Sequence, residues 1–67
     1  MKLGELIRLA RELRKMSMRD LEAKSGVSNA LISQIENGDV LNPGFRTVCK
    51  IADALGLSLK RLGETEG

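Results

Sequence analysis

The sequence of 67 residues contains no histidine, one cysteine (Cys49) and one aromatic residue (Phe45). One cysteine cannot form a disulfide within the chain, and the usual metal and catalytic residue sets are missing, so we expect no enzyme, metal site or cofactor. Few aromatics argue against a strand-rich fold and against stacking on single-stranded nucleic acid. Without a membrane-length apolar run or a signal-peptide pattern, we expect a cytoplasmic protein.

Apolar residues make up 42% of the chain and charged residues 30%, a balance typical of a globular domain. This length suffices for one small domain, predicted over residues 1–63, with 64–67 as a disordered tail. Residues 1–24 carry seven basic and four acidic side chains, whereas 25–67 carry four and five. The basic bias permits nucleic-acid binding but does not demand it, because a solvated helix face would look the same.

Apolar residues recur at helical spacing near the start of the chain, which predicts an amphipathic helix over 3–15. Its inward face would consist of Leu3, Leu6, Ile7, Ala10 and Leu13. The capping and helix-ending residues that follow indicate further short helices, over 18–24, 28–36, 44–55 and 58–62. The fold class predicted from this pattern is all-α, with five helices.

Serine and glycine set the ends of the second and third helices. Ser17 with Asp20 three residues on reads as a variant capping box. Gly26 stops the second helix, since glycine adopts the left-handed cap conformation at little cost. Ser28 is the predicted N-cap of the third helix.

The fourth helix is predicted to begin at Asn42-Pro43, an N-cap followed by proline at the first helical position. Its core face would consist of Phe45, Val48, Ala52 and Leu55, with Ile51 beside them. Cys49 is expected to pack as a small hydrophobe.

The segment 18–37 joins two short helices through a tight turn at Gly26. The helices must cross steeply, because apolar residues on both sides of the turn converge on a shared core; these are Leu21, Val27, Ile32 and Ile35. That arrangement is a helix-turn-helix, whose second helix can enter the major groove of DNA.

The runs SMRDL (17–21), SGVS (25–28), ISQIENG (32–38) and IADALGLS (51–58), with Asn42-Pro43 between the last two, resemble the Cro and lambdoid-phage-repressor (XRE-type) helix-turn-helix family. The resemblance covers about residues 4–62. It implies a five-helix domain with the helix-turn-helix at helices 2 and 3. It also implies a sequence-specific regulator of transcription, most often a repressor that binds a near-palindromic operator in double-stranded DNA as a homodimer.

The resemblance implies a base-reading set at Ser28, Asn29, Ala30, Leu31, Ser33 and Gln34. It implies DNA-backbone contacts at Met18, Asn37, Asn42, and the amides near Gly44 and Phe45. It matches Arg11 and Glu36 to a buried or half-buried salt bridge, the alternative being two surface charges of little energetic worth. Dimerisation would use the region of Leu57, Leu59 and Leu62.

Side-chain chemistry supports part of this assignment. The carboxamides of Asn29 and Gln34 carry a donor and an acceptor that match adenine in the major groove, and Ala30 or Leu31 could touch a thymine methyl. Positive charge for phosphates would come from Arg19 and Arg46, and less from Arg14, Lys15 and Lys24. The alternative is that these are ordinary solvent-facing residues.

Several residues depart from the family pattern. Residues 26–44 contain no lysine or arginine, and Asp39 lies in a loop where relatives often carry basic residues. Glu22 stands where the motif prefers a small residue, and we expect it to reach outward to water. These departures keep a second function open, a protein-interaction module of antitoxin or coactivator type whose partner covers Val40, Leu41 and Leu59.

Overall fold

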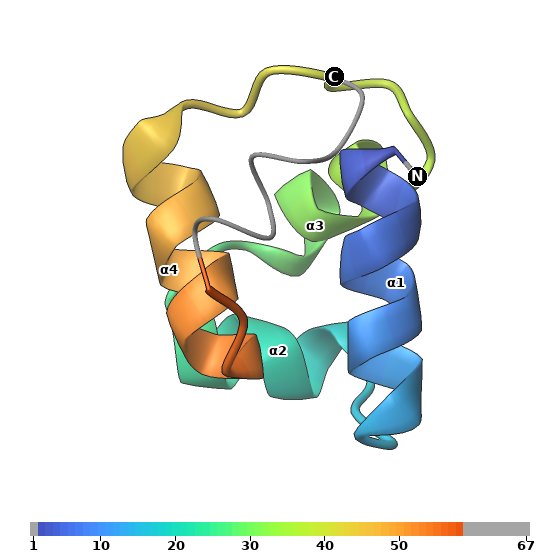
Figure 1. The fold of residues 1–67 in the computed structure, drawn as a ribbon, viewed down its shortest axis with the longest axis vertical. Coiled ribbons are helices and arrows are strands. Elements are labelled where there is room, and N and C mark those ends of the chain that lie inside the picture. The colour runs from blue at the N-terminus through green and yellow to red at the C-terminus, as the bar shows by residue number, and fades with distance from the viewer. Residues whose placement is uncertain (1, 59–67) are drawn as a thin grey trace.

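Four α-helices form the secondary structure of residues 2–58, the part of the chain that the computed structural model describes (Figure 1). They are α1 (Leu3–Leu13), α2 (Met18–Ser25), α3 (Asn29–Glu36) and α4 (Phe45–Leu55), and residues 2–58 include no strand. The predicted all-α class is confirmed. The fifth helix predicted over 58–62 and the tail predicted over 64–67 lie outside the described residues, except for Ser58. None of the four helices is long and apolar enough to cross a membrane.

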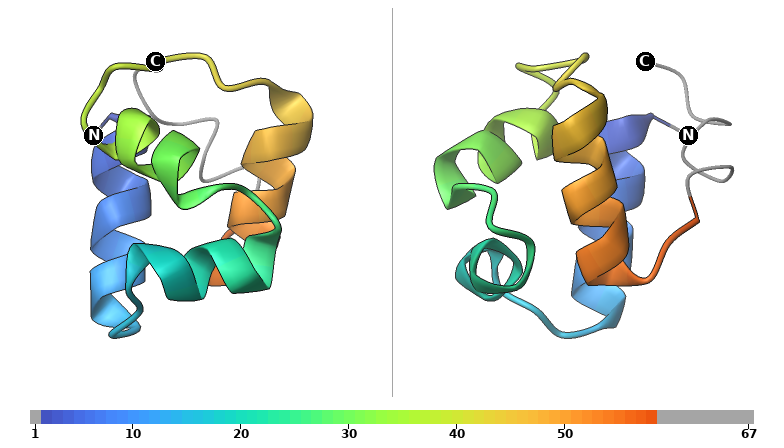
Figure 2. Two further views of the ribbon diagram at one scale, coloured as in Figure 1. Left: turned by 180° about the vertical axis from the view of Figure 1, so that it is seen from behind. Right: turned by 90° about the vertical axis from the view of Figure 1, so that its left-hand side faces the viewer.

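The helices α2 and α3 lie together on one side of the molecule, and α1 and α4 lie on the other (Figure 2). Across the two pairs, α2 packs mainly against α4 and α3 mainly against α1, and within the pairs α2 packs against α3 and α1 against α4. The loop over 37–44 crosses one end of the molecule from α3 to α4 (Figure 1). The outer sides of α2 and α3 therefore face away from the other described helices.

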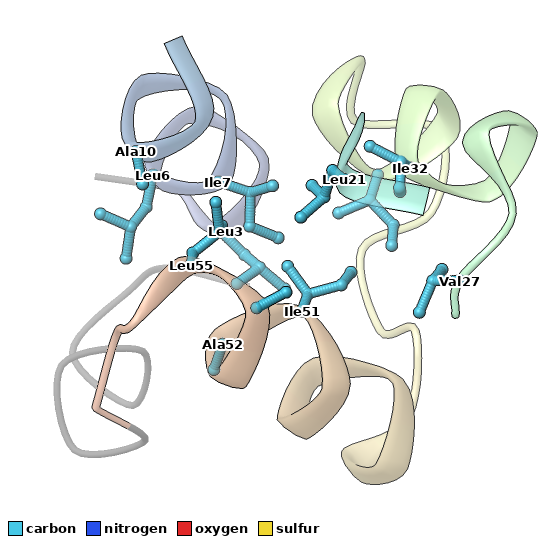
Figure 3. Packing of buried hydrophobic residues seen from close by; sticks show 12 residues of the cluster. Leu3, Leu6, Ile7, Ala10, Leu21, Val27, Ile32, Ile51, Ala52 and Leu55 are labelled. Atoms are coloured by element: carbon cyan, nitrogen blue, oxygen red, sulfur yellow. The ribbon is translucent and has the colours of Figure 1, made fainter. Parts of the chain in front are cut away.

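Apolar side chains from all four helices meet in one core (Figure 3). Its largest fully buried side chains are Ile7, Leu21, Ile32, Ile35, Ile51 and Leu55. Burying one such side chain stabilises the fold by about 1.5–3 kcal/mol relative to leaving it exposed. The shared core of the helix-turn-helix is confirmed, because Leu21, Ile32 and Ile35 are buried together with Val27.

The caps around α2 and α3 are those predicted. The hydroxyl of Ser17 accepts a hydrogen bond from the Asp20 amide at 3.0 Å, and the Asp20 carboxylate accepts one from the Ser17 amide at 2.8 Å. Gly26 ends α2 with φ 78°, in the left-handed region. Ser28 caps α3 by accepting a hydrogen bond from the Leu31 amide at 3.2 Å.

The first helix is shorter than predicted. It ends at Leu13, and Lys15 has φ 56°, which a continuing right-handed helix does not allow. Leu13 was predicted to face the core but is 72% exposed. The reason is positional, since the last turn of α1 extends past α2 (Figure 1).

The start of the fourth helix also differs from the prediction. The N-cap is Gly44 rather than Asn42, and its φ of 93° is open to glycine and strained for other residues. Phe45 was predicted in the core but is 77% exposed, because it opens the helix before α4 reaches its packing partners. Further along, Ile51, Ala52 and Leu55 are buried as predicted.

Candidate nucleic-acid interface

The connection between α2 and α3 is only three residues long, 26–28, and it is held by hydrogen bonds at each step. The Gly26 amide donates to the Glu22 carbonyl at 2.8 Å. Ser25 is buried, and its hydroxyl accepts a hydrogen bond from the Val27 amide at 3.1 Å. Val27 itself is buried in the core. The turn therefore holds α3 at a fixed angle to α2.

The helix α3 presents a polar stripe to solvent opposite its buried face. Its inward side is formed by Ile32, Ile35 and Glu36. The residues predicted to read bases are distributed over the outward side and its edges: Ser28, Ala30 and Gln34 are exposed, and Asn29, Leu31 and Ser33 are half-buried. Leu31 packs against the core, so it has less surface to offer a thymine methyl than Ala30 has.

Hydrogen bonds restrict some of these polar side chains. The Asn29 Nδ2 donates to the Glu22 Oε1 at 2.9 Å, and the Asn37 Nδ2 donates to the Ser33 Oγ at 3.4 Å. Glu22 therefore does not extend outward to water as predicted; it is half-buried against the start of α3. Sequence reasoning had no signal for this contact, because it depends on the angle between the two helices.

A buried ion pair anchors the far end of α3. The Nε and Nη2 of Arg11 donate to the two carboxylate oxygens of Glu36 at 2.8 and 3.0 Å, and Nη1 donates to the Met16 carbonyl at 2.8 Å. The hydrogen bond to Glu36 raises the pKa of the Arg11 guanidinium, against the opposing effect of burial. The alternative of two surface charges is excluded, because each residue is only 8% exposed.

Gly4 lies beside this ion pair and was missed at the level of sequence. A Cβ atom there would overlap the Ile35 carbonyl oxygen and lie 3.1 Å from the Cα of Glu36. The first turn of α1 can approach the end of α3 this closely only without a side chain. A glycine inside an apolar helical pattern was the available clue.

Most of the predicted phosphate-contacting residues are exposed to solvent. Arg19 on α2 and Arg46 on α4 are exposed, as are Asn37, Asn42 and Gly44. Met18 is half-buried and packs against the core. Among the weaker candidates, Arg14 donates to the Ala10 carbonyl at 2.8 Å, and Lys15 and Lys24 are exposed.

Two short helices joined by a tight glycine turn, with the second braced by an ion pair and exposing a polar stripe, define a helix-turn-helix domain. Comparison agrees: the profile of the helix-turn-helix family matches residues 7–62. The chain belongs to the XRE-type helix-turn-helix family, a family of transcriptional regulators and not of enzymes.

Several curated proteins with similar sequences are also named HTH-type transcriptional regulators or repressors. The chain is 45% identical over 53 residues to an uncharacterized HTH-type transcriptional regulator of Sinorhizobium fredii, covering 79% of this chain and 26% of that protein. It is 44% identical over 59 residues to the HTH-type transcriptional repressor RghR of Bacillus subtilis, covering 88% and 44%. It is 34% identical over 64 residues to the transcriptional regulator SlrR of the same species, covering 96% and 42%. The chain thus spans less than half the length of these relatives.

Proposed function

We propose that this domain is a sequence-specific binder of double-stranded DNA that regulates transcription, with α3 in the major groove. The observation that carries the proposal is the polar stripe on α3, held rigidly by the Arg11–Glu36 ion pair at one end and the Gly26 turn at the other. The major groove of B-form DNA is about 12 Å wide, which admits an α-helix. A rigid helix can place its side chains against base edges without a further ordering cost.

Base reading falls to a small set of side chains near the start of α3. Asn29 and Gln34 each offer a donor and an acceptor that match the N7 and N6 of adenine. Ala30 is exposed and fits a thymine methyl. No arginine is present on α3 for bidentate contact to guanine. The preferred half-site is therefore expected to be rich in A·T pairs.

Arg19 and Arg46 supply the proposed phosphate contacts, together with Asn37, Asn42 and the backbone amides of Gly44 and Phe45. The number of cations is small, so we expect each monomer to neutralise on the order of four or five phosphates or fewer. A plot of log affinity against log salt would then have a slope of about −4 or shallower per monomer.

The proposed assembly is a homodimer on a near-palindromic operator, acting as a repressor by occlusion. The relative RghR is named a transcriptional repressor, which supports repression by analogy. Leu57 is half-buried at the end of the described chain and is one of the proposed dimer residues. The other two, Leu59 and Leu62, lie outside the described residues.

Selection of bound sequences from random duplex DNA, at near-physiological salt, tests the proposal directly. An enriched inverted repeat with half-sites about one helical turn apart would support a dimeric regulator. Enrichment of a single half-site would support DNA reading but contradict the dimer. Absence of any enriched sequence, with only weak and salt-sensitive binding, would contradict sequence-specific recognition.

A protein-interaction module on the same fold is the second candidate. Exposed apolar side chains favour it, since Leu41 is 53% exposed and Phe45 77% exposed on the surface near the 37–44 loop. Leu41→Ser should disrupt such an interaction and leave DNA selection unchanged. Asn29→Ala and Gln34→Ala should do the reverse if the first proposal holds.

A further inference from the structure

Glu22 and Asn29 form a direct link between α2 and the first residue of α3. The Asn29 Nδ2 donates to the Glu22 Oε1 at 2.9 Å, and both residues are half-buried. Within residues 2–58, no lysine or arginine forms an ion pair with Glu22. The negative charge of Glu22 is thus directed at a side chain proposed to read bases, rather than neutralised by a cation.

The chemistry of this contact determines which way the Asn29 carboxamide faces. An ionised carboxylate can only accept hydrogen bonds, whereas a carboxamide has an accepting oxygen and a donating NH₂ group. The NH₂ group must therefore face Glu22, and the opposite orientation would set the Asn29 Oδ1 against a carboxylate oxygen. The Oδ1 and the second N–H of Asn29 remain available to a ligand.

The backbone around both residues holds this geometry in place. The Glu22 carbonyl accepts the Gly26 amide at 2.8 Å, next to the buried Leu21. On the other side of the turn, Ser28 caps α3 through the Leu31 amide. The two side chains thus start from fixed positions and meet without reordering either helix.

We propose that Glu22 is a specificity-determining positioning residue that presets Asn29 for adenine and against guanine. The inference rests on the proposed DNA-reading function of α3. One N–H of Asn29 is held by Glu22, the second donates to adenine N7, and Oδ1 accepts from the N6 amino group. Guanine presents O6 in place of that amino group, so the fixed Oδ1 meets a second acceptor.

Without Glu22 the carboxamide is free to turn. A turned Asn29 directs an N–H group rather than Oδ1 toward O6 and thus accommodates guanine. Glu22→Gln tests this directly, because glutamine has nearly the same shape but can either accept from the Asn29 NH₂ or donate to its Oδ1. The hydrogen bond is retained in both orientations, and only the directional constraint is lost.

The experiment uses the 67-residue chain and its selected operator. Selection with Asn29→Ala first identifies the base pair that Asn29 reads. Affinity is then measured at fixed salt for the operator and for the same duplex with adenine changed to guanine at that pair. A good bidentate contact corresponds to roughly 5- to 150-fold discrimination in the wild type. We expect Glu22→Gln to reduce the ratio about fivefold or more, to as little as no preference.

The controls separate positioning from charge and from folding. Asp53→Asn removes the same charge from an exposed site on α4 and should leave the ratio unchanged. Glu22→Gln should leave discrimination at the pair read by Gln34 unchanged, and should have no further effect in an Asn29→Ala background. Thermal melts verify the fold of each variant.

The following outcomes would overturn the inference. An unchanged adenine-to-guanine ratio in folded Glu22→Gln overturns the inference and leaves the DNA-reading function standing. An equal loss at the pair read by Gln34, or the same loss in Asp53→Asn, also overturns it by indicating a general charge effect. If the wild type selects no sequence at all, the proposed function and the inference fail together.

Discussion

The guanidinium of Arg11 and the carboxylate of Glu36 join the end of α1 to the end of α3 through two hydrogen bonds of 2.8 and 3.0 Å. The third hydrogen bond of Arg11, to the Met16 carbonyl, extends the link to the segment that leads into α2. One buried ion pair therefore connects α1, α3 and the segment that leads into α2. Its removal should affect both stability and the placement of α3.

Removing one partner of this pair should cost more than removing both. Arg11→Ala or Glu36→Ala leaves a buried charge without its partner, which typically costs about 3–5 kcal/mol. The double variant leaves no unpaired charge, so its melting temperature should lie above those of both single variants. Thermal melts at neutral pH measure this. If the loss of stability in the double variant equals the sum of the losses in the two single variants, the pair is not coupled.

Gly4→Ala should destabilise the domain although alanine is the better helix former. The added Cβ would overlap the Ile35 carbonyl oxygen, and relieving such overpacking typically costs about 1–3 kcal/mol. Urea unfolding measures the change in the free energy of unfolding. Glu12→Ala, at an exposed position of the same helix, is the matched control and should change it by about 0.5 kcal/mol or less. A stabilised Gly4→Ala variant would show that α1 and α3 can separate at no cost.

The capping box of α2 should make stability depend on acidic pH. The hydrogen bond from the Ser17 amide lowers the pKa of Asp20 below its usual value of 3.8. A carboxyl whose pKa is lower in the folded state stabilises the fold above the unfolded-state pKa, and this contribution is lost as the pH falls through the folded-state pKa. Wild type should therefore exceed Asp20→Asn in stability at pH 7, and the difference should shrink below about pH 3.8.

Denaturant titrations across this pH range compare the two proteins. A stability difference between wild type and Asp20→Asn that stays constant from pH 7 to pH 2 would contradict the role assigned to the Asp20 carboxylate charge. Ser17→Ala removes the hydroxyl half of the same cap, and at pH 7 it should cost about 1 kcal/mol.

Phosphate and base contacts should separate in binding assays. Arg19→Ala and Arg46→Ala should weaken binding to all sequences alike and each reduce the salt slope by about one. Asn29→Ala and Gln34→Ala should instead relax the preference at one base pair each and leave the slope unchanged. Fluorescence anisotropy at several salt concentrations measures both quantities. A slope corresponding to about ten released ions per monomer would contradict the small number of cations proposed.

Features that depend on neighbouring residues along the chain were predictable from the sequence. The caps at Ser17 and Ser28 and the left-handed turn at Gly26 were predicted and are observed. These devices satisfy backbone groups within three or four residues, so the local sequence contains all the information they need. The buried stripe of α1 as far as Ala10 follows from helical periodicity in the same way.

Features that depend on where other helices lie were not predictable. Leu13 and Phe45 continue apolar patterns, yet both are exposed because no described helix covers those turns. Asn42-Pro43 has the composition of a helix start, but the chain begins α4 later, at Gly44. In each case the local sequence pattern was compatible with burial or with a helix start, but the packing of the helices did not produce it.

The sequence by itself determined the all-α class, the helix-turn-helix with its turn, and the residues that form its shared core. Only the tertiary structure decided that Arg11 and Glu36 form a bidentate buried pair, that Gly4 must lack a side chain, and that Glu22 faces Asn29. The physical reason is that each of these contacts joins residues on two different helices. Periodicity and capping act within one helix, whereas these contacts depend on how closely and at what angle two helices cross.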